Sequence, residues 1–393
     1  MSFFKIKPRL LFFFALLLLV ISTSIKAEKL FETITGNDIN QFDFFKSHSI
    51  NVGGWGAFGG TYETTNPDNH INAPITFNDR TREFQLNQLN IFLQKSVDLE
   101  SKSWNIGGRL DFMYGADSRF TQTQGWDAHL THTNAPPLYD IAIPQAYLEI
   151  FAPLGRGVTL KLGHFYTIMG QEVVTAPNNF FYSHSYSMQY GEPFTHSGAQ
   201  VSYALNDNFT LNTGVITGWD NFTELPVNWN YLGGLSWTDD EATNTISWTV
   251  ISGNVNNTTI GNRSLSSLVV TYNFTNKFQY AFQHDFGYQS QTQLLNKNSY
   301  WYSVNQYLFY DLTDSVSAGL RAEWFRDNNG TRLNTGIPSN YFELTAGVNW
   351  KPREWFCIRP EFRYDQSSDN INPYVNQSKN HQFELAMDII LTI

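Results

Sequence analysis

The chain has 393 residues and a formal net charge of -10; 41% of its residues are hydrophobic and 15% are charged. The negative charge argues against nucleic acid as a partner, and a mean hydropathy of -0.33 is too low for a bundle of membrane-spanning helices. After the N-terminus no stretch offers the roughly 18 consecutive apolar residues that a spanning helix requires. If this is a membrane protein, it must cross the bilayer with strands.

Residues 1–27 read as a signal peptide, with basic residues between Lys5 and Arg9 and an apolar core from Leu10 to Ile21. Cleavage is expected after Ala27, with Ser24 as the alternative. Removing this segment deletes four cations and no anion, which changes the formal charge from -10 to -14. The sequence therefore predicts export.

Residues 28–48 do not alternate cleanly, and we expect a periplasmic extension or a short segment that touches the barrel lumen. From residue 49 to 393 the chain falls into segments of about ten residues with alternating hydrophobicity. Side chains alternate across a strand with period two, so each segment has one apolar and one polar face. The pattern predicts an all-β, transmembrane, up-and-down antiparallel barrel. About sixteen segments follow it, at residues 50–62, 84–97, 104–116, 142–151, 157–169, 198–205, 208–219, 230–238, 243–252, 263–274, 277–289, 299–311, 314–326, 340–350, 354–366 and 381–393.

Short and long polar connections alternate between these segments. This is expected of tight periplasmic turns and longer outer loops in a Gram-negative outer membrane. An even strand number places both termini on the periplasmic side. About sixteen strands also leave an interior wide enough for water, and counts of fourteen or eighteen remain open.

The last segment shows the two faces clearly, because Phe383, Leu385 and Met387 alternate with Glu384 and Ala386. Arg at position 385 should impair assembly, since a charge on the lipid face costs about 2 to 4 kcal/mol at the midplane. Arg at position 384 should be tolerated in a wet lumen. The same parity places the following charged residues inside the barrel: Arg109, Asp111, Glu149, Lys161, Asp285, Arg321, Glu323, Glu343, Arg359, Glu361 and Arg363.

Four stretches resemble the OmpL-like β-barrel porin family: GGWGAFGGTY (53–62), FNDRTREFQLNQLNIFLQK (Phe77–Lys95), GHFYTIMGQE (Gly163–Glu172) and NFFYSHSYSMQYGEPFTHSG (Asn179–Gly198). The similarity is dense from about residue 50 to 200 and diffuse beyond. It implies an outer-membrane barrel with pore activity and poorly defined substrates. One departure is the C-terminal Ile393, where many such barrels end in Phe.

The resulting hypothesis is a porin-like channel for passive diffusion of small polar solutes, with no bond chemistry, cofactor or metal. Charged side chains at a constriction select solutes by size and field. The inward charges named above are therefore the candidate pore lining, although several could simply pair between neighbouring strands. Besides solutes, the expected partners are outer-membrane lipid, lipopolysaccharide and the barrel-assembly machinery. A homo-oligomer remains open.

The third long connection, 170–197, is expected to fold into the barrel and narrow it. It is rich in aromatic residues such as Phe180 and Tyr186, which would gain by packing on the inner wall. Glu172 and Glu192 near its ends could face the inward arginines across the bore and complete the constriction. The alternative is that the aromatic residues cap the outer mouth or contact another protomer.

Two other function classes remain as alternatives. A structural or adhesin barrel would have no open lumen. A lipid-acting barrel enzyme would need a Ser activated by a His, and Ser183, His184, Ser185 and His196 supply only the residue types. His129 and His132 could touch one metal ion, but no carboxylate or Cys cluster supports a metal site there, and solvated loop histidines are the commoner case. The acidic run at 239–241 is better read as a polar turn than as a calcium loop.

Overall fold

The computed structural model describes residues 29–393 except 66, 129, 131–137, 223–228, 255–260, 291, 293–296 and 369–370. The strands are β1 (Asn51–Glu63), β2 (Phe84–Lys95), β3 (Asn105–Gly115), β4 (Asp140–Ala142), β5 (Ala146–Ala152), β6 (Val158–Tyr166), β7 (Thr195–Ala204), β8 (Phe209–Ile216), β9 (Asn230–Thr238), β10 (Thr245–Asn254), β11 (Asn262–Thr275), β12 (Phe278–Gln289), β13 (Ser299–Thr313), β14 (Val316–Asp327), β15 (Ser339–Arg353), β16 (Phe356–Ser367) and β17 (His381–Thr392). The helical elements are short: α2 (Leu30–Thr35), η2 (Ile39–Gln41), α3 (Asp43–His48), α4 (Ser118–Thr121), η3 (Ala176–Asn178) and η4 (Ser187–Gly191).

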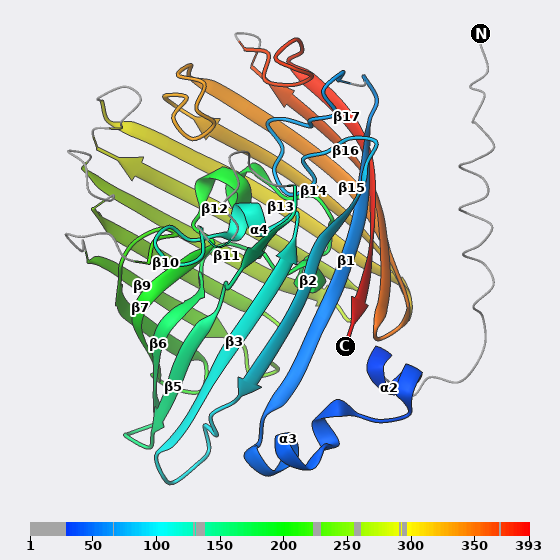
Figure 1. Ribbon diagram of the computed structural model, residues 1–393. Coiled ribbons are helices and arrows are strands. Elements are labelled where there is room, and N and C mark those ends of the chain that lie inside the picture. The colour runs from blue at the N-terminus through cyan, green and yellow to red at the C-terminus, as the bar shows by residue number, and fades with distance from the viewer. Residues whose placement is uncertain are drawn as a thin grey trace.

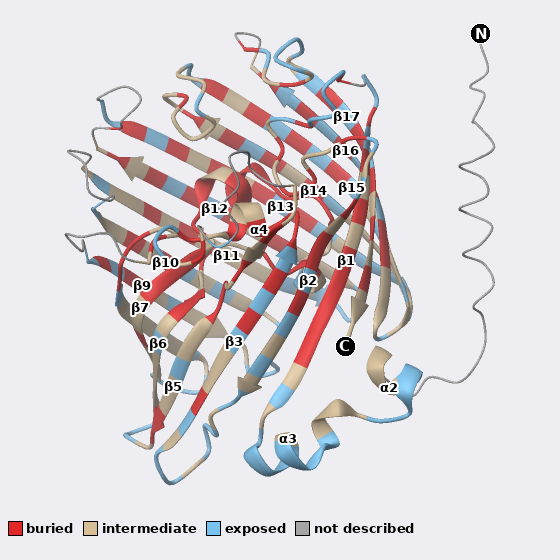
Figure 2. Ribbon diagram, viewed as in Figure 1, coloured by how far each residue is buried: buried red, intermediate tan, exposed pale blue. Residues whose placement is uncertain are grey.

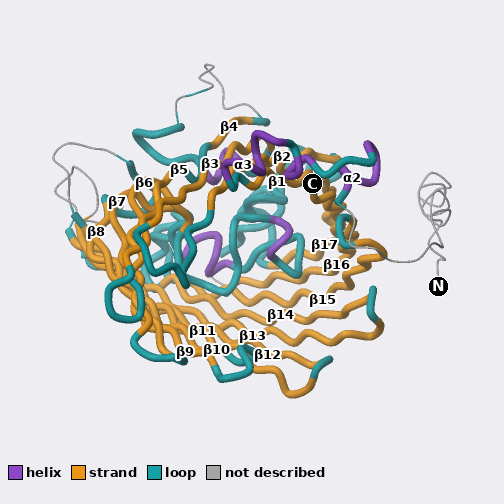
Figure 3. The backbone as a smooth tube through the Cα atoms, turned by 90° about the horizontal axis from the view of Figure 1, so that it is seen from below, coloured by secondary structure: helices purple, strands orange, loops and turns teal. Residues whose placement is uncertain are grey.

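The strands form one closed antiparallel barrel (Figures 1 and 3). β1 pairs with β2 on one side and with β17 on the other, and this closes the sheet. β4 and β5 both pair with β3, so they form one interrupted strand and the barrel has 16 strands. The predicted up-and-down barrel of sixteen strands is confirmed.

Burial alternates along the strands, as Figure 2 shows most clearly for β12 to β17. In β17, Phe383 and Leu385 are each 38% exposed, whereas Glu384 is fully buried. The predicted parity of the last strand is therefore right. Glu384, however, lies in packed protein beside Asn78 and Gln382 rather than in a wet lumen. An Arg at position 384 would lose the hydrogen bonds that Glu384 accepts from Asn78 and Gln382, and its tolerance stays a prediction.

The two ends of the barrel differ in their connections. At one end the turns are short, such as residues 276–277, 314–315 and 354–355, and both ends of the described barrel chain lie there (Figure 1). We call this the turn end and the opposite one the loop end. By the usual asymmetry of such barrels, the turn end faces the periplasm.

Residues 29–50 precede the barrel as α2, η2 and α3, beneath the turn end in Figure 1. Asn40 links them to β1, because its amide donates to the Val52 carbonyl and its oxygen accepts from the Val52 N–H. The expected signal peptide, residues 1–27, lies outside the described residues. Among those described, no helix has the length and apolar character to cross a bilayer.

Candidate functional site

The connection between β6 and β7, residues 167–194, folds into the barrel (Figure 3). Its aromatic side chains pack on the inner wall: the Phe180 ring lies 4.8 Å from that of Phe309, and the Tyr186 ring lies 5.3 Å from that of Tyr341. The predicted inward packing is confirmed. We call residues 167–194 the inward loop and the strands β12 to β17 the anchoring wall.

Carboxylates of the anchoring wall hold the backbone of the inward loop. Glu361 accepts the N–H groups of Tyr182 and Ser183 at 2.8 and 3.0 Å. Glu323 accepts those of Tyr186 and Ser187 at 2.5 and 2.7 Å, at the start of η4. These hydrogen bonds satisfy backbone donors that would otherwise be buried without a partner.

Arginines of the same wall bind the loop carbonyl groups. Arg321 donates to the Ser183 carbonyl at 2.7 Å and forms ion pairs with Glu172 and Glu343 at 2.5 and 2.9 Å. Arg363 donates to the His184 carbonyl at 2.5 Å and pairs with Asp365 at 2.8 Å. The wall thus offers acceptors and donors to successive peptide groups of the loop.

Arg359 completes this set nearer the turn end. Its Nη1 donates to the Ala176 and Asn179 carbonyl groups at 2.9 and 2.6 Å, and its other side pairs with Asp388 at 2.5 Å. The three arginines are 0 to 3% exposed. Their charges are neutralised by carboxylates, and the loop covers them. It fills the space in which the sequence predicted water.

The two acidic residues of the loop also contact the near wall and do not act across a bore. Glu172 pairs directly with Arg321. Glu192 accepts a short hydrogen bond from Gln283, which also donates to Asp285 at 2.7 Å. Asp285 in turn accepts from Ser303 at 3.1 Å. Both loop ends are therefore fixed to the anchoring wall.

On the other side of the inward loop lie the inner faces of β3, β5 and β6, which we call the open wall. Here Arg109 and Asp111 form an ion pair at 2.6 Å. Glu149 and Lys161 are register partners on β5 and β6. The Lys161 ammonium lies 4.5 Å from the Tyr147 ring, and Arg109, Glu149 and Lys161 are only partly buried.

A cavity of about 190 Å³ separates the inward loop from the open wall. Its lining from the open wall is Arg109, Gln145, Tyr166 and the adjoining Thr167, and its lining from the loop includes Glu172, Val174, Glu192 and Phe194. Sequence reasoning missed Gln145 and Tyr166 because it counted charged residues alone. Applying the strand alternation to every side chain that can form hydrogen bonds, and not to charged ones alone, would have drawn attention to these two residues.

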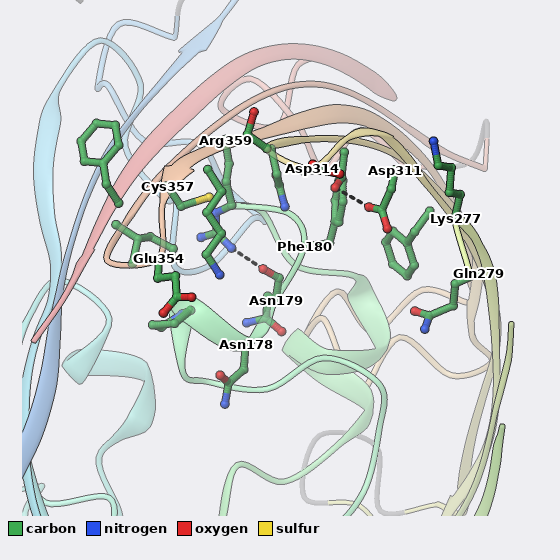
Figure 4. Close-up of a pocket in the computed structure, with 18 of the residues that line it drawn as sticks. Asn178, Asn179, Phe180, Lys277, Gln279, Asp311, Asp314, Glu354, Cys357 and Arg359 are labelled. Atoms are coloured by element: carbon green, nitrogen blue, oxygen red, sulfur yellow. Dashed lines mark hydrogen bonds between the residues drawn. The ribbon is translucent and has the colours of Figure 1, made fainter. Parts of the chain in front are cut away.

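A second cavity, of about 470 Å³, opens below the loop at the turn end (Figure 4). Asn178, Asn179 and Phe180 line it from the loop, and Gln279 and Asp311 line it from the anchoring wall. Figure 4 shows Arg359 reaching from the wall to the Asn179 carbonyl at the edge of this space. The loop thus divides the interior between the two ends of the barrel.

The serine and histidine residues of the enzyme alternative form no Ser–His hydrogen bond with one another in the described structure. The Ser183 hydroxyl accepts from Arg321 at 3.0 Å, and the Ser185 hydroxyl accepts from the Met188 N–H at 3.3 Å. His196 contacts the Gly218 carbonyl and the Thr167 hydroxyl, while the His184 ring packs 4.6 Å from that of Phe77. They have the roles of loop-packing residues.

The described residues contain no cluster of three His, Cys, Asp or Glu side chains suited to a metal ion. His129 and His132 lie outside the described residues. Asp239 accepts the backbone N–H groups of Asn244 and Thr243 at 3.0 and 2.7 Å. The Asn244 N–H, as the largest cause, holds the pKa of Asp239 below its ordinary value, so the acidic run caps a turn.

Comparison with known proteins places this geometry in context. The sequence profile of the family described as "Putative beta-barrel porin-2, OmpL-like" matches residues 49–393. No curated protein sequence matches the chain. Among solved structures, the outer membrane channel DcaP of Acinetobacter baumannii superposes with a TM-score of 0.58 at 10% identity, covering 88% of this chain and 97% of its own. An anion-selective porin from Comamonas acidovorans gives 0.60 at 9% identity, with 88% and 99% covered. The trimer form of Vibrio cholerae OmpT gives 0.56 at 11% identity, with the same coverage.

Proposed function

The chain belongs to the OmpL-like β-barrel porin family, and from this premise we propose that it conducts small polar solutes by passive diffusion through the gap between the inward loop and the open wall. The family and the fold make it an outer-membrane channel for solutes. The proposal that solutes pass between the inward loop and the open wall rests on one observation. The cavity of about 190 Å³ lies between a loop fixed to one wall and a polar surface on the other.

The lining chemistry supports polar solutes without a strong preference for one sign of charge. Arg109 is neutralised by Asp111, and Lys161 lies beside Glu149 in register. Mixed charges at a constriction orient dipolar solutes and hinder apolar ones. We assign the pore-facing charges of the open wall to these four residues, of which Arg109 lines the cavity itself, and loop anchoring to Arg321, Glu323, Arg359, Glu361 and Arg363.

The partners fit the same proposal. Apolar side chains such as Leu89, Ile91, Phe112 and Leu148 are 41 to 58% exposed on the outer face, as lipid contact requires. A lipid-facing barrel in the outer membrane adjoins lipopolysaccharide and depends on the assembly machinery. The trimer form of the similar OmpT structure favours a homo-oligomer.

Replacing residues 177–190 with a short Gly-Ser linker tests the constriction. We expect a several-fold higher single-channel conductance and a larger size limit for sugars in liposome swelling. The barrel should stay folded, because each arginine that loses its loop contact retains an ion pair within the wall. These pairs are Arg321 with Glu343, Arg359 with Asp388 and Arg363 with Asp365. Unchanged conductance in a heat-modifiable deletion variant would place the constriction elsewhere. A wild-type protein without conductance would favour the structural or adhesin barrel.

A further inference from the structure

Two arginines near the loop end of the interior differ from the anchoring arginines. Arg263 is on the inner face of β11 at its first residues, next to Gln289 of β12. Arg332 belongs to the connection after β14 and reaches down to the inward loop, where its Nε donates to the Tyr190 carbonyl at 2.6 Å. The two residues are brought together through Trp219, which follows β8.

The guanidinium groups of both arginines stack on tryptophan rings. Arg263 lies 4.7 Å from the Trp219 ring centre and Arg332 lies 5.2 Å from it. Arg332 also lies 4.7 Å from the ring of Trp301, which is fully buried and fixed by a 3.1 Å hydrogen bond to the Gly191 carbonyl. The stack fixes two positive groups in one place, and both arginine residues are of intermediate exposure.

Among the residues that the structure describes, most hydrogen-bond donors of this cluster find no protein acceptor. Within that part of the chain, Arg263 donates from its Nε alone, to Gln289 at 2.8 Å, and Arg332 likewise donates from its Nε alone. Among the described residues, no carboxylate forms an ion pair with either guanidinium group. The buried indole N–H of Trp219 also has no acceptor there. Arg321, in contrast, has protein acceptors for all three of its nitrogens.

Two nearby carboxylates, Asp220 and Asp327, attract the arginines electrostatically, but they hold backbone N–H groups and form no ion pair with the arginines among the described residues. Asp327 accepts the backbone N–H groups of Thr331, Arg332 and Leu333 at 2.8 to 3.1 Å. Asp220 accepts those of Phe194 and Thr195 at 2.9 and 2.8 Å. They hold the connections that carry Arg332 and Trp219, so the cluster is preorganised, and within the described part of the chain its terminal NH₂ groups have no acceptor.

We propose that Arg263 and Arg332, stacked on Trp219, form a binding site for small multivalent oxyanions, such as solutes bearing phosphate or two carboxylates, at the outer mouth of the channel. A guanidinium group offers two parallel N–H donors that match the oxygen spacing of phosphate and carboxylate. Such a ligand would supply the acceptors that the cluster lacks. This site deepens the proposed function, because a solute held there would enter the bore next.

Calorimetric titration of the detergent-purified protein at low ionic strength tests the site without requiring conduction. Inorganic phosphate is one probe and succinate is the other, and the tighter of the two identifies the preferred oxyanion class. We expect R263Q and R332Q each to weaken binding about tenfold, as expected for a lost hydrogen bond to a charged group. The matched control is R156Q, in an exposed turn at the opposite end, where Arg156 pairs with Asp207.

The same probes should reduce single-channel KCl current when added at the loop end, and R263Q/R332Q should relieve the reduction. R263K and R332K retain the charge but lose the two-pronged geometry, so binding should be weakened in them as well. Wild-type affinity retained in R263Q/R332Q, or no binding of either probe by the folded wild-type protein, would overturn the site. Binding without any conductance would overturn the proposed channel and leave the site standing.

Discussion

The anchoring wall and the open wall carry the same kind of sequence, yet their charges have different surroundings. Glu323, Glu361 and Arg363 on β14 and β16 are at most 4% exposed, because the inward loop covers them. Arg109 and Lys161 on β3 and β6 remain partly exposed, and Arg109 faces the loop across a cavity. Strand parity places all of these residues inside the barrel. The course of one loop decides which of them meet peptide groups and which can meet solute.

The difference also predicts different energetics. A buried charge that loses its partner leaves an uncompensated charge at low dielectric, which costs about 3 to 5 kcal/mol. A partly exposed charge remains hydrated, and its pairing contributes about 0 to 1 kcal/mol. Substitutions on the two walls should therefore separate stability from conduction.

The largest effect is expected for R321M on the anchoring wall. Glu172 and Glu343 would both remain buried without their cation, and the free energy of unfolding should fall by about 3 to 5 kcal/mol. The matched variant K161M on the open wall should lose no more than about 1 kcal/mol. Urea unfolding, followed by the heat-modifiable gel shift, measures both. Equal losses would remove the distinction between the walls.

The next effect tests the parity on which the comparison rests. L385R places a charge on the lipid face and should lower folding yield, with a cost of about 2 to 4 kcal/mol near the midplane. E384Q keeps the volume of the inward residue and one acceptor oxygen for its two donors, Asn78 and Gln382, so its yield should stay well above that of L385R. Folding into lipid vesicles gives the yields. Similar yields for both variants would show that the β17 register is wrong.

A smaller effect is expected when a loop anchor is weakened without creating an unpaired charge. Glu323 binds the Tyr186 and Ser187 N–H groups with separate oxygens. The single amide oxygen in E323Q can accept from only one of them, and its NH₂ group faces the other, a loss of about 1 to 3 kcal/mol. The loop should leave the wall more often, seen as more frequent closures in single-channel records. E149Q on the open wall should not increase them. An unchanged closure frequency in E323Q would mean that the remaining hydrogen bonds and ion pairs are enough to hold the loop on the wall.

The smallest effect concerns selectivity. K161Q removes a partly exposed positive charge from the open wall, so the reversal potential under a KCl gradient should shift slightly towards cations. R359Q removes a charge that Asp388 neutralises beneath the loop, and in molecules that remain folded it should shift the potential less. A larger shift of the reversal potential for R359Q than for K161Q would mean that the anchoring arginines line the conducting path.

Local pattern was sufficient for much of the fold. The segment 230–238 coincides with β9, and the alternation of 381–393 identified the outward and inward faces of β17. The aromatic content of 170–197 indicated a loop that packs inward, and the structure has it at 167–194. These inferences succeed because the two-residue period of a strand and the cost of exposing aromatic side chains act within a few residues.

The roles of the inward charges were decided by the tertiary structure. Arg321 meets Glu172 across 149 positions of sequence, and Arg359 meets the Asn179 carbonyl across 180. The stack of Arg263, Trp219 and Arg332 draws on strand β11 and on the separate connections after β8 and β14, and nothing in their local patterns marks them. The side of the barrel on which a side chain lies follows from the alternation of its own strand. Its partner, burial and hydration depend on how the barrel closes and where the inward loop lies, and these are properties of the whole chain.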